Sequence, residues 1–231
     1  MPVAPIPAYL SETYWWAYVH PKAVRLFERQ WLVNLILWGN FARLRDRALD
    51  ALGDALPGRT LQVACVYGDF TARLCERVAA GKGKLDVVDV LPVQLANLHA
   101  KLRPGAPATL LQQDASRMGL ADDTYDRAVL FFLLHEMPAE VRRRTLAEAL
   151  RVTRRGGHVV IVDYHRPRPW HPLRGVMRWI LRHFEPFALD LWAQEVDAWL
   201  PPGARVIAKD TCYGGLYQRL VVEARGVRPA T

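Results

Sequence analysis

The chain has 231 residues, of which 51% are hydrophobic, 10% aromatic and 23% charged. Such a chain can bury a full core, which excludes wholesale disorder and a disulfide-stapled miniprotein. Lysine and arginine together number 31, and aspartate and glutamate 23, so the formal net charge is +8. A positive excess favours an anionic partner, such as a membrane surface, a nucleic acid or a phosphate-bearing ligand.

Cysteine usage and hydropathy indicate the compartment. The three cysteines, Cys65, Cys75 and Cys212, are irregularly spaced, so we expect neither a disulfide framework nor a zinc site. The amino end has no basic region followed by an apolar one, so no signal peptide is expected. The longest apolar stretch, residues 31–38, is interrupted by Asn34 and is much shorter than the roughly 20 residues of a membrane-spanning helix. These features predict a cytoplasmic protein without a spanning helix.

Helical spacing of apolar residues predicts a helical region from Lys22 to about Leu56, ended by Pro57 and Gly58. The chain then alternates between short apolar runs, expected as strands, and helical patterns. The expected strands are residues 61–66, 85–90, 109–112, 127–134 and 158–163, and the expected helices are residues 71–79, 92–101 and 139–153. This alternation predicts an α/β fold with a parallel sheet covered on both faces, whose ligands bind at the carboxyl ends of the strands.

A nucleotide-like site is indicated where the first two expected strands end. Gly68, at the turn into a helix, lets the backbone approach a ligand, and helix-terminal N–H groups can hold a carboxylate or phosphate. Asp89 ends the second strand about 20 residues later, where an acid can accept hydrogen bonds from ribose hydroxyls. After the third strand, Asp114 could bind an adenine amino group. The alternatives are that Gly68 makes a simple turn and that Asp89 caps the helix beginning at Pro92.

With His135 and Glu136 at the end of the next apolar run, this order resembles the class I S-adenosylmethionine-dependent methyltransferases, especially those of quinone biosynthesis. The resemblance covers about residues 60–163. It implies a Rossmann-like fold with a mostly parallel seven-stranded sheet. On this basis residues 1–57 would form an N-terminal helical cap and residues 58–231 the cofactor-binding domain, with a lid insertion at about residues 164–200. The implied S-adenosylmethionine contacts are Gln62, Ala64, Cys65, Gly68, Asp89, Val90, Gln94, Asp114 and Ala115.

The first loop departs from the family pattern of an acid followed by Gly-x-Gly-x-Gly. Gln62 stands at the position of the acid, Ala64 and Val66 replace two glycines, and only Gly68 remains. We expect the cofactor still to bind, with its amino-acid end placed differently.

A closer resemblance, to the rhodoquinone biosynthesis family RquA, is found in residues 14–40, 61–69, 85–98 and 161–174. It implies that ubiquinone is converted to rhodoquinone by replacing a ring methoxy with an amino group, with S-adenosylmethionine as amino donor and Mn2+ as a helper. The attacking amine must be neutral, and a carboxylate beside it would stabilise its protonated form. Our hypothesis is that Gln62 instead lowers the pKa of the amine while still anchoring it by a hydrogen bond.

Attack on the ring also needs a proton acceptor and an activator of the quinone carbonyl. His135, with an unperturbed pKa near 6.5, suits proton transfer. Tyr67 and Asp69 could orient the amine or accept a proton; the alternatives are a packed tyrosine and a helix N-cap. Mn2+ prefers oxygen and imidazole ligands. The candidate ligands are His135, Glu136, Asp163 and His165. Alternatively, the first two of these only cap the next helix, or the metal bridges quinone oxygens with few protein ligands.

Residues 164–184 contain five arginines and no acid. At helical spacing, one stripe is apolar, another is basic, and two tryptophans flank them, which predicts a helix lying in the headgroup plane of the inner membrane. The stripes are Leu173, Met177, Ile180 and Phe184, and Arg174, Arg178 and Arg182, with Trp170 and Trp179 as anchors. Alternatively, this helix packs its apolar stripe on the core. The aromatic cluster in residues 14–21 could cover the quinone ring or belong to the core.

Two other functions compete with quinone amination. One is conventional C- or O-methylation of a quinone precursor or lipid, and the other is a noncatalytic, S-adenosylmethionine-binding membrane module. Nucleic-acid binding is not expected, because the basic run Arg142–Arg144 lies between Glu140 and Glu148 and resembles a solvated helix face.

Overall fold

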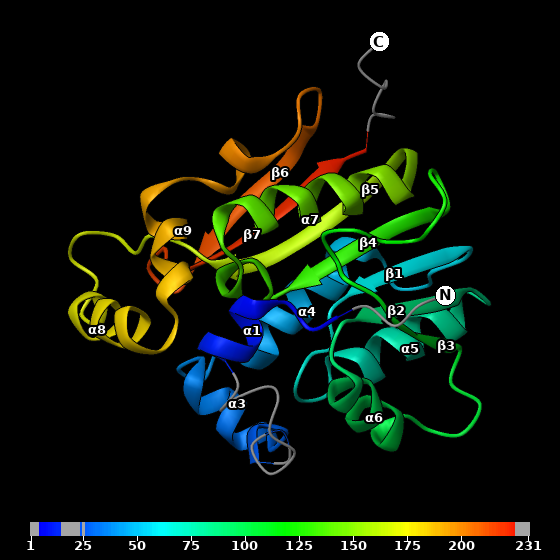
Figure 1. Ribbon diagram of the computed structural model, residues 1–231, viewed down its shortest axis with the longest axis horizontal. Helices are drawn as coiled ribbons and strands as arrows, with labels where there is room; N and C mark the ends of the chain where they lie inside the picture. The colour runs from blue at the N-terminus through cyan, green and yellow to red at the C-terminus, as the bar shows by residue number, and fades with distance from the viewer. Residues whose placement is uncertain (1–4, 15–23, 25, 225–231) are drawn as a thin grey trace.

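Seven strands form one sheet in the spatial order β3-β2-β1-β4-β5-β7-β6. The computed structural model describes residues 5–14, 24 and 26–224 (Figure 1). The strands are β1 (Arg59–Val63), β2 (Lys84–Asp89), β3 (Ala108–Gln112), β4 (Tyr125–Phe131), β5 (Thr153–Tyr164), β6 (Arg205–Cys212) and β7 (Tyr217–Glu223). The α-helices are α1 (Ala8–Thr13), α3 (Gln30–Ile36), α4 (Phe41–Leu52), α5 (Phe70–Ala80), α6 (Pro92–Lys101), α7 (Ala139–Val152), α8 (Arg174–Phe184) and α9 (Asp190–Ala193). Three short 3-10 helices are Leu134–Glu136, Pro186–Leu189 and Val196–Trp199.

The sheet is mostly parallel, which confirms the predicted fold class. β1 pairs in parallel with β2 and β4, and β5 continues the parallel order beyond β4. Only β7 runs antiparallel, between β5 and β6. The carboxyl ends of β1 to β5 therefore meet at one edge, beyond which α1, α3 and α8 lie (Figure 1).

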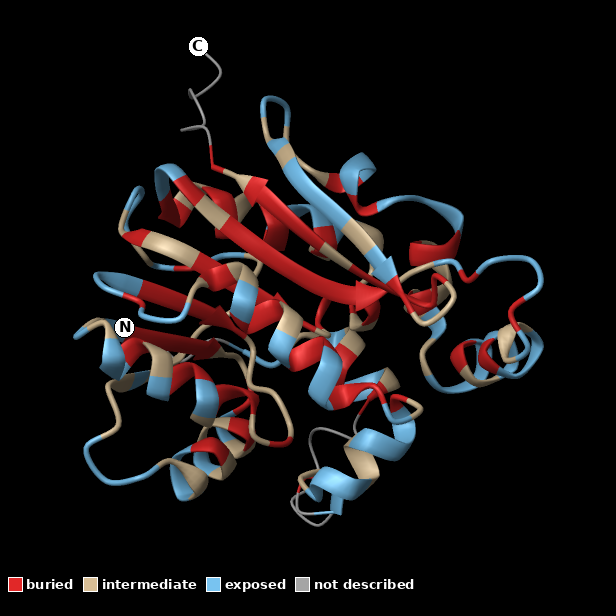
Figure 2. Ribbon diagram, turned by 180° about the vertical axis from the view of Figure 1, so that it is seen from behind, coloured by how far each residue is buried: buried red, intermediate tan, exposed pale blue. Residues whose placement is uncertain are grey.

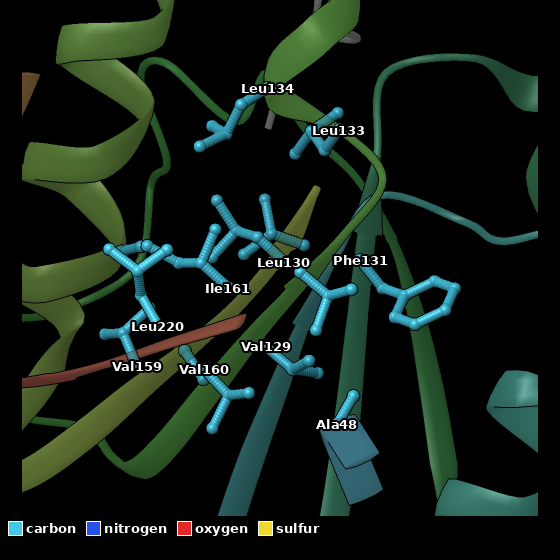
Figure 3. Packing of buried hydrophobic residues seen from close by; sticks show 14 of the residues in the cluster. Ala48, Val129, Leu130, Phe131, Leu133, Leu134, Val159, Val160, Ile161 and Leu220 are labelled. Carbon is cyan, nitrogen blue, oxygen red and sulfur yellow. The ribbon is translucent and has the colours of Figure 1, made fainter. Parts of the chain in front are cut away.

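The core lies on both faces of the central strands. β4 and β5 contribute consecutive buried apolar residues, as expected for strands covered on both sides (Figure 3). α7 crosses one face of the sheet in Figure 1, and α4 crosses the other, seen from behind in Figure 2. Ala48 of α4 is fully buried in the same cluster as Val129 and Ile161. The cysteines are free, as predicted, and no described helix is both long and apolar enough to span a membrane.

The single N-terminal helical region predicted up to Leu56 is divided into α3 and α4. Trp38 and Gly39, with φ of 52° and 76°, take left-handed conformations that end α3. Asn40 stabilises the break, because its side-chain amide donates to the carbonyls of Leu37 at 3.1 Å and Trp38 at 2.9 Å. The local hydrogen bonds of this asparagine outweigh the continuous apolar spacing.

Arg142 corrects the prediction that residues 142–144 form a solvated face. Its side chain is fully buried, whereas the next two arginines are exposed. The guanidinium donates to the carbonyls of Leu134 and Met137, both at 2.9 Å, and of Phe187 at 3.0 Å. It also lies 4.4 Å from the ring of Trp199. These acceptors pair the Nε and Nη2 atoms of a buried cation that sequence spacing alone placed in solvent, and Nη1 lies 3.6 Å from a carboxylate oxygen of Asp190.

Candidate functional site

A cavity of about 670 Å3 lies at the carboxyl edge of the sheet. Its walls come from the loops after β1, β2, β3 and β4, from the end of β5, and from α1, α3 and α8. The walls facing the sheet carry polar groups, and those from α3 and α8 are apolar. One continuous space therefore joins the nucleotide-like loops to an apolar chamber.

Asp89 links the first two loops at the polar end. Its Oδ2 accepts a hydrogen bond from the backbone N–H of Cys65 and its Oδ1 one from Leu91, both at 2.8 Å. Burial raises the pKa of Asp89 more than these backbone bonds lower it. The carboxylate lines the cavity in a fixed orientation, as required to accept hydrogen bonds from vicinal hydroxyls. Asp89 therefore joins both loops, and it does not cap the next helix, because Leu91 precedes the first residue of α6.

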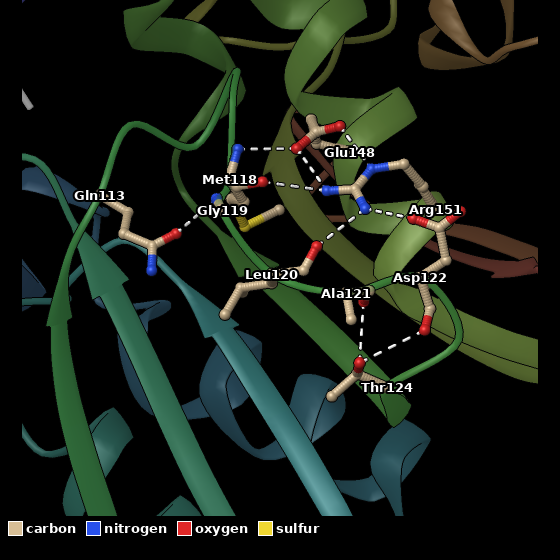
Figure 4. Close-up of polar contacts among 9 residues, drawn as sticks. All are labelled: Gln113, Met118, Gly119, Leu120, Ala121, Asp122, Thr124, Glu148 and Arg151. Carbon is tan, nitrogen blue, oxygen red and sulfur yellow. Dashed lines mark hydrogen bonds and ion pairs between the residues drawn. The ribbon is translucent and has the colours of Figure 1, made fainter. Parts of the chain in front are cut away.

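The third acidic position, Asp114, also lines the cavity, and its Oδ1 accepts from the backbone N–H of Ser116 at 2.8 Å. The loop that follows it is held from α7 (Figure 4). Arg151 donates to the carbonyl of Leu120 at 2.9 Å and is bridged to Glu148, which accepts from the N–H of Met118 at 2.7 Å. These contacts fix the loop between β3 and β4 on which the predicted adenine contact depends.

The first loop has an unusual backbone for its sequence. Ala64 has a φ of 70°, a left-handed conformation that favours glycine, the residue typical of the family here. Beneath it, the amide of Gln62 is fully buried and donates to the carbonyl of Ala64 at 2.9 Å. The Oε1 atom of Gln62 has no hydrogen-bond donor among the described residues. Gly68 is required, because a Cβ there would lie 2.8 Å from the ring of Phe41.

Glu28, a residue that sequence analysis missed, contacts this first loop through its side chain. Its Oε1 accepts from the backbone N–H of Gly68 at 3.1 Å and from Lys101 Nζ at 2.7 Å, and its Oε2 accepts from Asn97 at 2.6 Å. Lys101 also donates to the carbonyls of Val66 and Gly68, both at 2.9 Å. The N-terminal region, the first loop and α6 are thus joined by one partly buried charge network.

Tyr67 lines the cavity, and its hydroxyl accepts a hydrogen bond from Gln94 at 2.7 Å. Its ring stacks on Phe27 at a centroid distance of 6.1 Å. Burial raises the pKa of Tyr67 well above its usual value. The phenol is therefore neutral at physiological pH and can orient a ligand through its hydroxyl.

His135 is held by Asp163. The ring Nδ1 lies 2.9 Å from Asp163 Oδ1, and that carboxylate also accepts from the N–H groups of Leu134 at 2.8 Å and Tyr164 at 2.7 Å. Burial lowers the pKa of His135, but the charge and hydrogen bond of Asp163, with Glu185 and Glu136, outweigh it and raise the pKa to about 9. The ring therefore holds its proton at neutral pH. It is placed to donate a proton, in contrast to the acceptor role expected from an unperturbed histidine.

Glu185, at the end of α8, is the second residue that sequence reasoning missed. Its carboxyl lines the cavity, and its Oε2 is buried without a donor among the described residues. Burial raises the pKa of Glu185, while the charge of His135 and a hydrogen bond from Tyr14 lower it. The pattern Glu-Pro after a helix carries no signal of this position, because only the fold brings it to the cavity.

The four predicted metal ligands do not form one site. Asp163 uses its oxygens on His135 and on backbone N–H groups. His165 lies outside the cavity wall, with Nδ1 2.7 Å from the carbonyl of Gly215 and Nε2 3.3 Å from Glu195. Across the described ranges, no three histidine, cysteine or acidic side chains are grouped to hold a metal ion. Glu136 does line the cavity, and its Oε1 lies 3.8 Å from His135 Nε2. The helix that follows begins after Pro138 without a side-chain cap, so capping does not explain this pair.

Asp69 is also placed away from the cavity wall. Arg45 donates to it at 2.8 Å and Arg73 at 2.7 Å. Burial raises the pKa of Asp69, but the hydrogen bonds from both arginines outweigh it and lower the pKa. It precedes α5 without making a capping hydrogen bond. Asp69 therefore joins α4 to α5 and is not positioned to take a proton from a ligand in the cavity.

Most of the predicted cofactor contacts are brought together by the fold. Those that line the cavity are Ala64, Cys65, Asp89, Val90, Gln94, Asp114 and Ala115. Gln62 and Gly68 lie behind this surface and shape the loop. Of the aromatic cluster predicted in residues 14–21, Tyr14 is buried, and the rest lies outside the described residues.

Comparisons with known proteins agree with this geometry. Residues 60–157 match the family profile described as "Methyltransferase domain". A demethylmenaquinone methyltransferase of Beutenbergia cavernae is 33% identical over 157 residues, which cover 66% of this chain and 60% of that protein. A phosphatidylethanolamine N-methyltransferase of Cereibacter sphaeroides is 29% identical over 163 residues, which cover 69% of this chain and 76% of that protein. The match thus spans less than two thirds of the Beutenbergia protein.

A solved structure shares the fold at low sequence identity. The N-methyltransferase NodS from Bradyrhizobium japonicum WM9, in complex with S-adenosyl-L-homocysteine, superposes with a TM-score of 0.60 and 17% identity. The superposition covers 79% of this chain and 86% of NodS. The sheet order, the match to the methyltransferase domain profile and this structural similarity together show the fold. The chain has the Rossmann-like fold of the class I S-adenosylmethionine-dependent methyltransferases.

Proposed function

We propose that this protein converts ubiquinone to rhodoquinone, replacing a ring methoxy with an amino group that S-adenosylmethionine donates. The observation that carries the substrate class is the continuous cavity, with the acids Asp89 and Asp114 at one end and the apolar walls of α3 and α8 at the other. A sulfonium nucleoside suits the first end, and a quinone with an isoprenoid tail suits the second. The similarity to a demethylmenaquinone methyltransferase supports a quinone in this space.

The polar residues at the carboxyl ends of β1, β2 and β3 fit the proposed cofactor. Asp89 would accept from the ribose hydroxyls and Asp114 from the adenine amine, and both face the cavity. The unpaired Oε1 of Gln62 lies behind the cavity surface, so it would accept from the amine end once the loop at Ala64 moves to admit that end; a methyltransferase of this fold usually has a carboxylate at this position. When bound, S-adenosylmethionine supplies a primary amine. An amide beside that amine stabilises its protonated form less than a carboxylate would, which favours amination over methyl transfer.

The proposed reaction needs two proton transfers that residues of the cavity can perform. A C–N bond forms at the ring as the nitrogen loses a proton, and the ring C–O bond breaks as the methoxy oxygen gains a proton and leaves as methanol. The bond from nitrogen to its former α-carbon is then cleaved by water, whose hydroxyl goes to the carbon and whose remaining proton goes to the nitrogen, so no oxidant or reductant is needed. The Glu185 carboxyl, unpaired at Oε2, would accept the proton that the nitrogen loses. His135, protonated beside Asp163, would donate to the departing methoxy oxygen or hydrogen-bond a quinone carbonyl. Tyr67 would orient the nitrogen.

Manganese stays a proposal that rests on the resemblance to RquA. The described residues do not group three metal-binding side chains, so no step above is assigned to the metal.

One labelling experiment tests amination against methyl transfer. The purified protein is incubated with ubiquinone, Mn2+ and S-adenosylmethionine carrying 15N in its amine and 13C in its methyl group, and the extracted quinone is weighed by mass spectrometry. We expect a quinone that has lost a methoxy and gained one 15N. A control with unlabelled cofactor should give the same product one mass unit lighter.

Two other functions give different masses. A 13C methyl in the product would identify a C- or O-methyltransferase, a candidate favoured by the similarity to enzymes that methylate a quinone precursor and a phospholipid. Cofactor binding without any product, over a panel of quinones and lipids, would identify a noncatalytic S-adenosylmethionine-binding module.

A further inference from the structure

Exposed apolar side chains are concentrated on two helices. Among the described residues, ten large hydrophobic side chains are exposed, and six of them belong to α3 and α8. Their exposed fractions range from 42% to 64%. The six are Trp31, Leu35, Ile36, Val176, Trp179 and Phe184. Single exposed apolar residues need no explanation, but a cluster of this kind marks an interaction site.

The cavity opens onto this cluster. Leu35, Ile36 and Phe184 both line the cavity and are exposed, so they form the rim of its mouth. The turn after α3 contacts α8, because the indole N–H of Trp38 lies 3.0 Å from the sulfur of Met177, which also lines the cavity. An apolar molecule too long for the cavity would leave it between these two helices.

The buried and exposed faces of α8 differ from those predicted for this segment. Of the predicted apolar stripe only Met177 is buried, together with Leu181 outside the stripe, whereas Phe184 is exposed. Val176 and Trp179 nevertheless remain exposed, and so do Arg178 and Arg182. The helix therefore presents aromatic and aliphatic groups together with cations to the outside. This combination is typical of a helix that lies at a lipid interface.

The positive charge of α8 and of the segment before it indicates which partner binds the exposed apolar cluster. The segment from Tyr164 to Phe184 has five arginines and no acid. In a symmetric dimer the same surface of each copy would meet, and these arginines would oppose one another. A bilayer containing anionic lipids instead attracts each of them.

We propose that α3 and α8 together form a docking surface for anionic bilayers, here called the α3–α8 surface and defined by Trp31, Leu35, Ile36, Val176, Arg178, Trp179, Arg182 and Phe184. The mouth of the cavity lies within this surface, so an isoprenoid tail passes directly between the bilayer and the chamber. The statement about the tail rests on the proposed quinone substrate. The statement about docking does not.

Vesicle co-sedimentation tests the surface with variants that lie outside the cavity wall. The variants are Trp31→Ser with Trp179→Ser, and Arg178→Gln with Arg182→Gln. The vesicles are phosphatidylcholine alone or mixed with phosphatidylglycerol. The wild type should bind the mixed vesicles much more tightly, and each double variant should bind them at least about tenfold more weakly, because arginines near an anionic surface and buried indoles each contribute strongly.

Matched controls come from elsewhere on the chain. Ile207→Ser removes an apolar side chain that is 49% exposed on β6, and Arg103→Gln with Arg117→Gln removes two exposed cations. Both controls should bind within about twofold of the wild type. Equal vesicle binding by the surface variants and the wild type would overturn the proposal. So would loss of a dimer in the tryptophan variant with unchanged vesicle binding, which would make this face a contact between copies.

A second measurement separates docking from catalysis. With a short-tailed, water-soluble quinone and no vesicles, the surface variants should convert substrate at the wild-type rate. With a long-tailed quinone in vesicles, they should be at least about tenfold slower. Vesicle binding through this surface without any quinone conversion would refute the proposed function and leave the docking surface intact. Conversion of both quinones at wild-type rates by all variants would refute the docking surface alone.

Discussion

Gln62 stands at the base of the first loop with its two amide atoms in different situations. The nitrogen donates to the carbonyl of Ala64 at 2.9 Å, whereas the buried oxygen has no donor among the described residues. An unmet acceptor of this kind costs about 1–3 kcal/mol, which a bound amine would recover. The residue therefore both supports the left-handed turn at Ala64 and leaves a hydrogen-bonding position beneath it.

Gln62→Glu tests whether this amide sets the chemistry. A carboxylate would stabilise the ammonium form of the cofactor, so amination should fall by at least about tenfold per unit rise in amine pKa above the working pH. Cofactor affinity, measured by calorimetry, should be kept within a few-fold. Gln62→Ala is the control: it removes the hydrogen bond without adding charge, and should weaken cofactor binding. Equal amination by the Glu variant and the wild type would contradict the hypothesis.

The buried side chain of Arg142 joins three parts of the chain around the site: α7, the loop after β4 and the segment after α8. Arg142 projects from α7 and donates to the carbonyls of Leu134 and Met137 in the loop after β4, and to that of Phe187 beyond α8. The first two carbonyls flank His135 in sequence, and the third follows Glu185 by two residues. One guanidinium thus holds together the two segments that carry the candidate acid and base.

Arg142→Met should be strongly destabilising for this reason. The substitution leaves buried carbonyls without donors, and loss of one partner from a buried charged network costs about 3–5 kcal/mol. Urea unfolding of the variant and of the wild type measures the loss. Arg143→Met, an exposed neighbour on the same helix, is the control and should change the free energy of unfolding by less than about 0.5 kcal/mol. A small loss for Arg142→Met would contradict the bridging role.

Local sequence patterns predicted which helices and strands form better than they predicted helix boundaries or tertiary side-chain contacts. The helix Pro92–Lys101 was predicted with the same bounds, because a proline starts it and apolar periodicity runs through it. The break at Trp38 and the burial of Arg142 were not foreseen, because each depends on acceptors distant in sequence or on local side-chain bonds. Glu28 and Glu185 reach the site only through tertiary packing. The spacing of apolar residues along the sequence does not predict such tertiary contacts.

At the scale of the whole molecule, parallel topology explains why polar side chains from three different strand ends converge. Asp89 ends β2, Asp114 follows β3 and His135 follows β4, and parallel strands end at one edge, so the strand ends in the sequence were enough to predict the polar end of the cavity. The four predicted metal ligands are not grouped in the described residues, because the same rule says nothing about which side of the edge a side chain faces. Asp163 turns to His135, and His165 turns away to Glu195.

Coupling between His135 and the fold makes stability depend on pH in a defined direction. The pKa of His135 rises from 6.5 to about 9 in the folded protein, so the folded state binds the proton more tightly than the unfolded chain. The resulting stabilisation is complete below about pH 6.5 and is lost as the pH rises through about 9. At about 1.4 kcal/mol per pKa unit, the shift corresponds to roughly 3 kcal/mol.

His135→Asn isolates this contribution, because asparagine can still donate a hydrogen bond to Asp163 but carries no titrating proton. The free energy of unfolding, measured in urea at pH 6, 7.5 and 9, should favour the wild type most at pH 6. The advantage should shrink by up to about 3 kcal/mol at pH 9. The comparison is made in a Glu185→Gln background, because the charge of His135 lowers the pKa of Glu185 and the titration of that carboxyl would otherwise differ between the two proteins. An advantage that stays constant or grows with pH would mean that the buried ring is neutral, and the proton assigned to the departing methoxy would then have to come from another group.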